Sequence, residues 1–145
     1  MSDFLLKIVT PEKVVLSKQV SQVSVSTVEG QITVLPNHVP LVSRLAPGEV
    51  IAKTGNQEEN LMVVSSGLVE VLPGQVIILA DSAEHVEEID EQRAEEAKQR
   101  AQDILESKVL NKEEFAFFTA QIEKELARLR VVKKHKKHRI DSPLE

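Results

Sequence analysis

The 145-residue chain contains no cysteine, which excludes disulfide bridges and thiolate metal sites. Its four histidines stand at positions 38, 85, 135 and 138 and show no metal-ligand spacing such as His-Glu-x-x-His. The pair His135 and His138 encloses two lysines, whose positive charges would repel a bound cation. The sequence therefore predicts no metal site.

Motifs that carry catalysis are also missing. The segment Ser65-Ser66-Gly67 lacks the Gly-x-Ser-x-Gly context of a nucleophile elbow. Gly30, Gly48 and Gly55 form neither a Walker-type loop nor a dinucleotide-binding loop. Because the sequence has no recognisable acid–base pair, activated nucleophile or metal site, we predict a non-catalytic protein that requires no cofactor.

Long hydrophobic runs are absent as well. The longest, 61–64 and 76–80, are strand-sized and far shorter than the roughly 20 residues of a membrane-spanning helix. The start, with Asp3 and Lys7 among its apolar residues, lacks the uninterrupted apolar stretch of a signal peptide. We expect membrane association only through partner proteins.

The net charge of −5 is unevenly distributed. Residues 83–132 carry thirteen acidic and eight basic side chains, whereas residues 133–145 carry five basic and two acidic ones. The basic end is expected to be a solvated, partly disordered tail that docks at most on an acidic protein surface. The alternative, attraction to phosphates, is opposed by the acidic chain as a whole, and we expect no nucleic-acid binding.

Glycine and proline divide the chain into two parts. All five glycines and five of the six prolines precede residue 75, and residues 83–132 contain neither. In the first part, short β-rich runs alternate with turn signals, including Glu29-Gly30 as a hairpin tip and the dipeptides Pro47-Gly48 and Pro73-Gly74. This pattern predicts a β-sandwich with strands near 4–9, 14–16, 20–28, 31–35, 50–53, 61–64, 68–72 and 76–80.

The second part is rich in helix formers over 86–108 and 112–132, with Asp90 and Asn111 as candidate N-caps. The short connection predicts an antiparallel hairpin. We expect small side chains of the first helix to face large ones of the second, namely Ala94, Ala97, Ala101, Ile104 and Lys108 against Phe115, Phe118, Ile122, Leu126 and Leu129. Such a hairpin is only marginally stable alone and therefore detachable.

The fold prediction is thus β plus α, an N-terminal β-sandwich followed by a C-terminal antiparallel two-helix hairpin. The expected parts are a sandwich over 1–83, a hairpin over 84–132 and a flexible basic tail over 133–145. One loop of the sandwich is distinctive, because Pro36 and Pro40 hold the chain between them in a stiff, non-helical projection that presents His38. From the residues alone, His38 either bonds to nearby backbone or contacts a partner.

Three segments, 29–41, 65–74 and 89–94, together resemble the epsilon subunit of F-type ATP synthases, and the resemblance extends over about 4–132. It implies a rotor subunit whose sandwich contacts the gamma subunit and the polar loops of the c-ring. The implied contacts are Gln31, Ile32, Pro36, His38 and Pro40. Gln31 stands where the family usually has an acid and Thr33 where it has glycine. A neutral Gln31 cannot form the salt bridge to a basic loop that the resemblance implies, although it can form a hydrogen bond.

The segment Ile89-Asp90-Glu91-Gln92-Arg93-Ala94 resembles a motif that, in some bacterial members, binds ATP when the hairpin is folded. The resemblance implies ATP as a regulatory ligand, with candidate ligand residues Glu84, Asp90, Arg93, Arg100, Lys124 and Arg128. Lys124 stands where ATP-binding members carry arginine, and an ammonium cannot reproduce a guanidinium fork. The alternative is that Asp90 caps the helix and Arg93 pairs with a neighbouring carboxylate.

The resemblance also implies an extended state, in which the last helix leaves the sandwich, touches an acidic loop of a beta subunit and impedes ATP hydrolysis. The residues that would make this inhibitory contact are Arg128, Arg130, Lys133, Lys134, Lys136, Lys137 and Arg139. The implied location is peripheral, on the cytoplasmic face of a bacterial membrane or the stromal face of a thylakoid. The alternative function is a free-standing adaptor whose basic tail binds polyanions.

Overall fold

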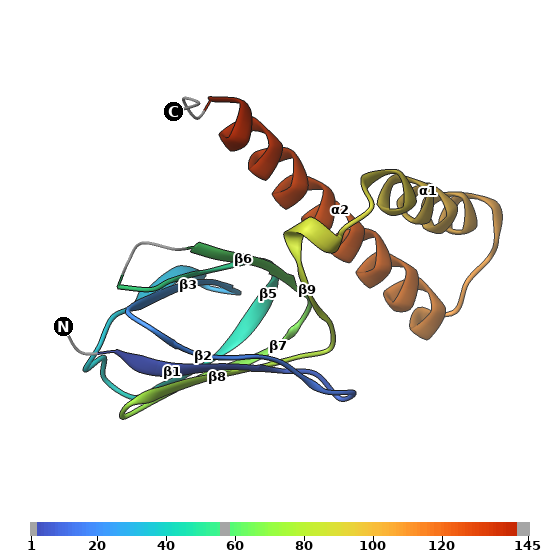
Figure 1. Ribbon diagram of the computed structural model, residues 1–145. Helices are drawn as coiled ribbons and strands as arrows, with labels where there is room; N and C mark the ends of the chain where they lie inside the picture. Colours follow the sequence, from blue (N-terminus) through green and yellow to red (C-terminus); the bar gives the residue numbers. More distant parts are fainter. Residues whose placement is uncertain (1–2, 56–58, 142–145) are drawn as a thin grey trace. The chain divides into compact units, whose positions relative to one another are not determined.

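A computed structural model describes residues 3–55 and 59–141, with side chains as far as Lys136. The chain forms two compact units, one ending at His85 and the other beginning at Val86 (Figure 1). Within the described residues, the first unit consists of strands and the second of helices.

The first unit contains the strands β1 (Phe4–Val9), β2 (Val14–Val20), β3 (Gln22–Thr27), β4 (Gly30–Val34), β5 (Leu41–Lys53), β6 (Glu59–Val64), β7 (Gly67–Leu72), β8 (Gln75–Ala80) and β9 (Ala83–His85). They are hydrogen-bonded in the order β2-β1-β8-β7-β5-β3-β4, and β6 pairs with both β5 and β9. Only β1 and β8 run parallel; the other described pairs are antiparallel.

The long strand β5 joins the two layers of the sandwich (Figure 1). Its first part, 41–45, pairs with β7, whereas 48–53 pairs with β6. The side chains between the layers form one apolar core, in which Leu6, Ile8, Val25, Met62 and Ile78 have no exposed surface. The predicted β-sandwich is confirmed, with its core filled by alternate residues of β1, β7 and β8.

The prediction that Pro47-Gly48 forms a turn is wrong. Both residues lie inside β5, where this strand passes from one layer to the other. The opposing strand β3 is irregular between Val25 and Thr27. A Cβ on Gly48 would lie only 2.8 Å from Ser26 Oγ, so glycine permits the close approach of the two strands at the bend. The short strand β9 was also not predicted.

The second unit contains the 3-10 turn η1 (Val86–Glu88) and the helices α1 (Glu91–Ser107) and α2 (Lys112–Asp141). The two predicted caps are confirmed. Asp90 Oδ1 accepts a hydrogen bond from the backbone N–H of Arg93 at 3.1 Å, and Asn111 Oδ1 accepts one from that of Glu114 at 2.8 Å. The first helix begins at Glu91 rather than 86, because η1 and the extended backbone of Asp90 precede it.

The helix pair departs from the sequence expectation in two ways. Ala94 and Ala101 are buried as predicted, but Phe115 and Leu126 are exposed. All side chains over 112–117 are exposed, so the packed stripe of α2 starts one turn later and contains Phe118, Ile122, Glu125, Leu129 and Val132. The backbone of α2 also remains helical to Asp141, beyond the predicted end at Val132.

Candidate functional site

The loop between β4 and β5 is a tight turn. The backbone N–H of His38 donates to the carbonyl of Leu35 at 3.2 Å, which closes the turn, and Asn37 has a φ of 67°. Proline at the second position and a positive φ at the third are the features of a type II turn. The predicted non-helical loop is present, and its turn is made by Pro36 and Asn37 rather than by the two prolines together.

The residues expected to contact a partner differ in their exposure to solvent. Gln31 and Pro40 are exposed, whereas Ile32, Pro36 and His38 are half-buried, and Ile32 packs against the sandwich core. His38 Nδ1 lies 2.7 Å from the carbonyl oxygen of Val39, so this histidine has the local backbone contact considered in the sequence. The side chain of Val39 is 71% exposed, so the tip of the loop offers an apolar group to solvent.

An apolar outer face on the sandwich is a feature that sequence reasoning missed. Strands β1, β8, β7 and β5 are neighbours, and in their register Val9 pairs with Leu79 and Leu79 with Leu68. Charged residues lie among these apolar ones, because Lys7 pairs with Ile77, Arg44 with Leu68 and Glu70 with Val42. Leu68, Leu79 and Val42 are 42%, 46% and 62% exposed. The signal for this face was present, because β1 and β8 are nearly continuous apolar runs rather than alternating ones.

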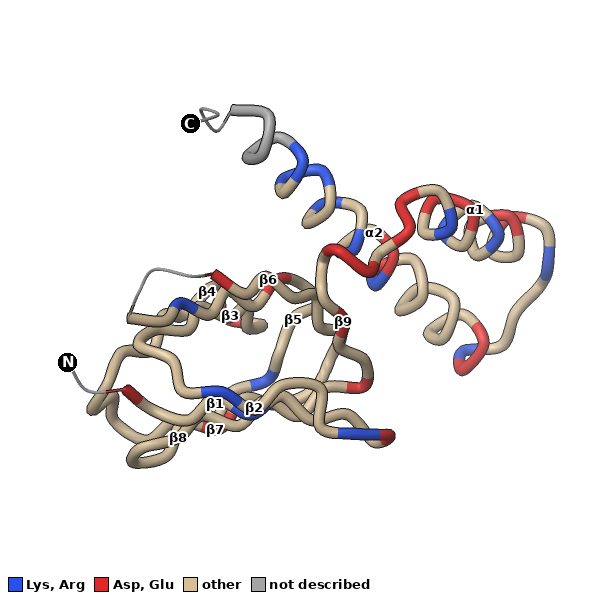
Figure 2. The backbone as a smooth tube through the Cα atoms, in the orientation of Figure 1, with Lys and Arg blue, Asp and Glu red and all other residues tan. Residues whose placement is uncertain are grey.

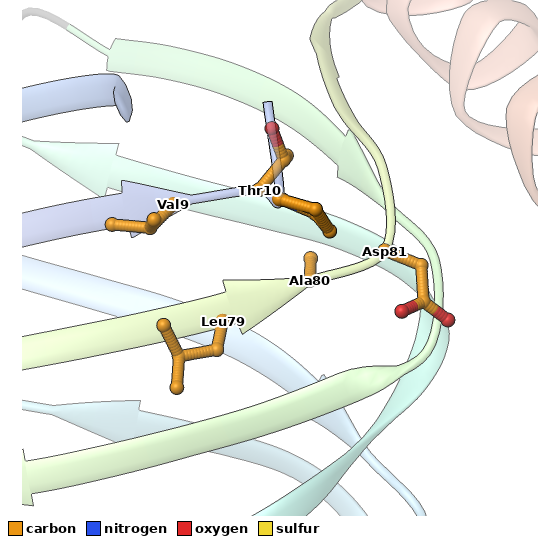
Figure 3. A pocket seen from close by; sticks show the side chains of 6 residues that line it. Val9, Thr10, Leu79, Ala80 and Asp81 are labelled. Carbon is orange, nitrogen blue, oxygen red and sulfur yellow. The ribbon is translucent and has the colours of Figure 1, made fainter. Parts of the chain in front are cut away.

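A shallow pocket of about 330 Å³ lies at one end of this face (Figure 3). It is lined by Val9, Thr10, Pro11, Leu79, Ala80 and Asp81, from the ends of β1 and β8. Most of its lining is apolar, and Asp81 supplies the carboxylate. The described residues contain no cluster of three His, Asp or Glu that could hold a metal ion.

The start of α1 has the geometry of a capped helix. Asp90 caps the helix, and its Oδ2 atom lies 3.7 Å from Arg93 Nε. The side chains of Arg93 and Asp90 are 85% and 56% exposed, so this is a solvent-screened pair. The alternative interpretation of the motif, a cap with a local ion pair, describes this arrangement.

The candidate ATP ligands are divided between the two units. Glu84 lies on β9 of the sandwich, and the other candidates lie in the helical unit. Arg100 is exposed on α1, and Lys124 is half-buried on α2. Arg128 Nη1 donates to Glu125 Oε2 at 2.7 Å, and the Glu125 side chain is only 4% exposed. Arg128 thus compensates a buried carboxylate.

Most basic residues of α2 lie in its second half (Figure 2). Arg130, Lys133, Lys134 and Lys136 are exposed, and the side chains of Lys137 and Arg139 lie outside the described residues. Lys136 Nζ lies 2.5 Å from Glu91 Oε2 in the first turn of α1. Sequence reasoning considered this basic segment as a solvated tail, a contact for an acidic protein surface or a binder of polyanions, and did not identify its acidic partner in α1.

Comparison with known proteins identifies the relatives of the chain. Residues 3–86 match the model of the ATP synthase delta/epsilon chain beta-sandwich domain, and 87–133 match that of its long alpha-helix domain. The ATP synthase epsilon chain of Dehalococcoides mccartyi is 43% identical over 138 residues, which are 95% of this chain and 98% of that one. The epsilon chain of Chloroflexus aggregans is 44% identical, with 90% and 93% covered.

Solved structures have the same fold. A chain of the Euglena gracilis mitochondrial ATP synthase aligns with a TM-score of 0.76 at 22% identity, covering 95% of this chain and 83% of that one. A chain from the central stalk and c-ring of the Tetrahymena thermophila enzyme aligns with a TM-score of 0.62 at 12% identity, covering 90% and 97%. The resemblance seen in the sequence is confirmed: the chain belongs to the delta/epsilon family of ATP synthase, as an epsilon-type, non-catalytic subunit.

Proposed function

We propose that the sandwich links the gamma subunit to the c-ring of a proton- or sodium-driven ATP synthase. Two features of the sandwich carry this proposal: the tight turn in the loop at 35–40, and the exposed apolar side chains of Leu68, Leu79 and Val42 on the outer face. An exposed apolar face of this kind is typical of protein interfaces. A short loop fixed by its own backbone suits a contact with polar loops, because little entropy is lost on binding.

Binding of the full-length chain to purified gamma subunit tests the role of the outer face. Leu68→Asp replaces an exposed apolar side chain of the outer face by a charged one and is expected to weaken the affinity by at least about tenfold. Val28→Asp is the matched control, because Val28 is also exposed (55%) but lies at the tip of the β3–β4 hairpin. Equal affinities of the wild type and Leu68→Asp would refute the contact. Salt-sensitive binding of the wild-type chain to polyanions, without affinity for gamma, would favour the adaptor alternative instead.

For the helical unit, we propose a two-state element that restrains ATP hydrolysis. The compact hairpin has a seam of small residues, Ala94 and Ala101, and thus buries little surface. In an extended state, cations of α2 such as Arg130 and Lys134 would meet an acidic loop of a beta subunit. A complex reconstituted with the full chain should then hydrolyse ATP more slowly than one reconstituted with residues 1–85. Equal rates would exclude restraint by the helices.

ATP is proposed as a regulatory ligand of the compact hairpin. Arg93 and Arg100 support it, because they are seven residues apart on one helix and both are exposed. Guanidinium groups in such a row can bind phosphate oxygens. Recruiting Arg128 would cost more, because its partner Glu125 is buried. Calorimetric titration of the full chain with ATP tests the site. Arg93→Ala should abolish saturable binding and Gln92→Ala should keep it; no binding by the wild type refutes the proposal.

The peripheral location also remains a proposal for this chain. None of the described helices is long and apolar enough to cross a membrane. Contacts with gamma and the c-ring would hold the chain on the cytoplasmic face of a bacterial membrane, or on the stromal face of a thylakoid. Salt washing of membranes that retain the rotor should leave the chain bound, whereas removal of gamma should release it.

A further inference from the structure

Two segments of opposite charge lie in the helical unit. Residues 87–96, which include the last two residues of η1 and the first turns of α1, carry six acidic side chains and one arginine. Residues 126–136 of α2 carry five basic side chains and no acidic one. Because α1 and α2 run antiparallel, the second half of α2 passes the start of α1 (Figure 2). The fold therefore brings the two charged segments together.

The direct contact joins Lys136 and Glu91, which are 45 residues apart in the sequence. The Glu91 side chain is only 33% exposed, and that of Lys136 is 62% exposed. Glu91 is in the first turn of α1, where a carboxylate also interacts favourably with the helix dipole. The family's helix model ends at residue 133, so Lys136 belongs to the part of α2 that continues beyond it.

A second acidic residue lies one turn further along α1, and a second lysine lies one turn earlier in α2. Glu95 follows Glu91 by four residues, so the two glutamates lie on one face of α1. Lys133 precedes Lys136 by three residues, so the two lysines lie on one face of α2. Glu95 Oε1 lies 2.8 Å from Lys98 Nζ. This hydrogen bond is the main reason why the pKa of Glu95 is below its ordinary value, and the positive charge of Lys133 lowers the pKa further. The influence of α2 on α1 thus extends over two turns.

We propose that Lys133 and Lys136 form an electrostatic clip that holds the end of α2 on the acidic start of α1 and keeps the hairpin closed. The clip compensates for a seam that contains mainly alanine on the α1 side. The clip also controls whether the basic segment can bind elsewhere. A lysine paired with Glu91 is not available to an acidic surface on another subunit, so opening the clip precedes any such contact. Only this last consequence rests on the proposed function.

The clip is tested by amide hydrogen exchange on the full-length chain without partner subunits. Lys136→Glu is expected to accelerate exchange in the first half of α1 about two- to fivefold at an ionic strength of about 50 mM. At about 0.5 M salt the difference should largely disappear, because the pair is partly exposed and therefore screened. Sandwich strands should exchange as in the wild type. Unchanged exchange in α1 would overturn the proposal.

A charge swap separates the pair from general effects of charge. Glu91→Lys alone weakens α1, partly because a cation at a helix start opposes the dipole. Adding Lys136→Glu should restore protection, whereas adding Lys112→Glu should not, because Lys112 lies at the other end of α2. Equal behaviour of the two double variants would overturn the clip. Since no partner is present, this result is independent of whether the chain restrains hydrolysis.

Discussion

At the scale of single residues, Asn37 is the best example of a backbone requirement that selects a side chain. Its φ of 67° lies in the left-handed region, which asparagine tolerates and β-branched residues avoid. We expect Asn37→Val to destabilise the sandwich by about 1–2 kcal/mol and Asn37→Gly to leave it nearly unchanged. Urea unfolding of the full chain measures both. Equal loss in the two variants would mean that the asparagine side chain, rather than the backbone, supports the turn.

Glu95 gives a prediction about pH. Its pKa lies below the ordinary value of 4.5 in the folded chain, first because of the hydrogen bond from Lys98 and then because of the charge on Lys133. A lowered folded-state pKa contributes stability that is present above the unfolded-state pKa and is lost as the pH falls through the folded-state value. Hydrogen exchange in α1 should therefore be slower in the wild type than in Glu95→Gln at about pH 7, and the two should converge near pH 3. If the difference in exchange rate between the two proteins did not change with pH, the effect would come from packing rather than from the charge of Glu95.

At this scale, the sequence alone predicts the structure where a residue type has one common role in the local backbone. Asp90 and Asn111 were identified as caps, and Pro36 and Pro40 identified the stiff loop, because these effects depend only on neighbouring backbone. His38 could not be settled in this way. A histidine at this position can bond to nearby backbone, as His38 does with the carbonyl of Val39, or it can contact a partner. Both interpretations fit the same residue, so the sequence alone does not distinguish them.

At the scale of elements, prediction failed where tertiary contacts override local signals. Pro47-Gly48 is a turn signal, but here it permits β5 to bend between two layers and pair on both sides. The α2 helix continues through Lys133–Lys136, which were expected in a flexible tail, and pairs there with α1. Phe115 fits the helical period, yet the packed stripe begins at Phe118. Period alone does not specify where along a helix the packing starts.

Gly67 provides the sharpest test at the scale of elements. It has a φ of +158°, and a Cβ there would lie 1.9 Å from the carbonyl oxygen of Leu79 on the neighbouring strand β8. Because the obstacle is backbone, no side-chain rotation relieves it. Gly67→Ala should cost at least about 3 kcal/mol in the free energy of unfolding. Gly55→Ala, with no atom within 4 Å of the added Cβ, should be nearly neutral. Comparable losses of unfolding free energy in both variants would show that the conformational entropy of the backbone, rather than the clash with Leu79, determines the effect of the substitution.

At the scale of the whole molecule, the separate cores of the two units determine how the chain responds to truncation. The sandwich core, from Phe4 to Ala80, consists only of residues before Val86. The buried residues of the helical unit, such as Ala94, Ala101 and Leu129, are fewer. Since stability follows buried apolar area, the sandwich should be the more stable unit, and the helices should open without it.

Two measurements follow from this difference. The fragment 1–85 should fold alone, with a midpoint of thermal unfolding within about 4 °C of the sandwich transition in the full chain. In the full chain, amides of α1 and α2 should exchange faster than those of β1, β7 and β8, and added salt should widen the gap by weakening the clip at Glu91. A fragment that does not fold, or helices that exchange at the same rate as the strands, would show that the two units unfold as one. The switch proposed for the helices would then have no independent element on which to act.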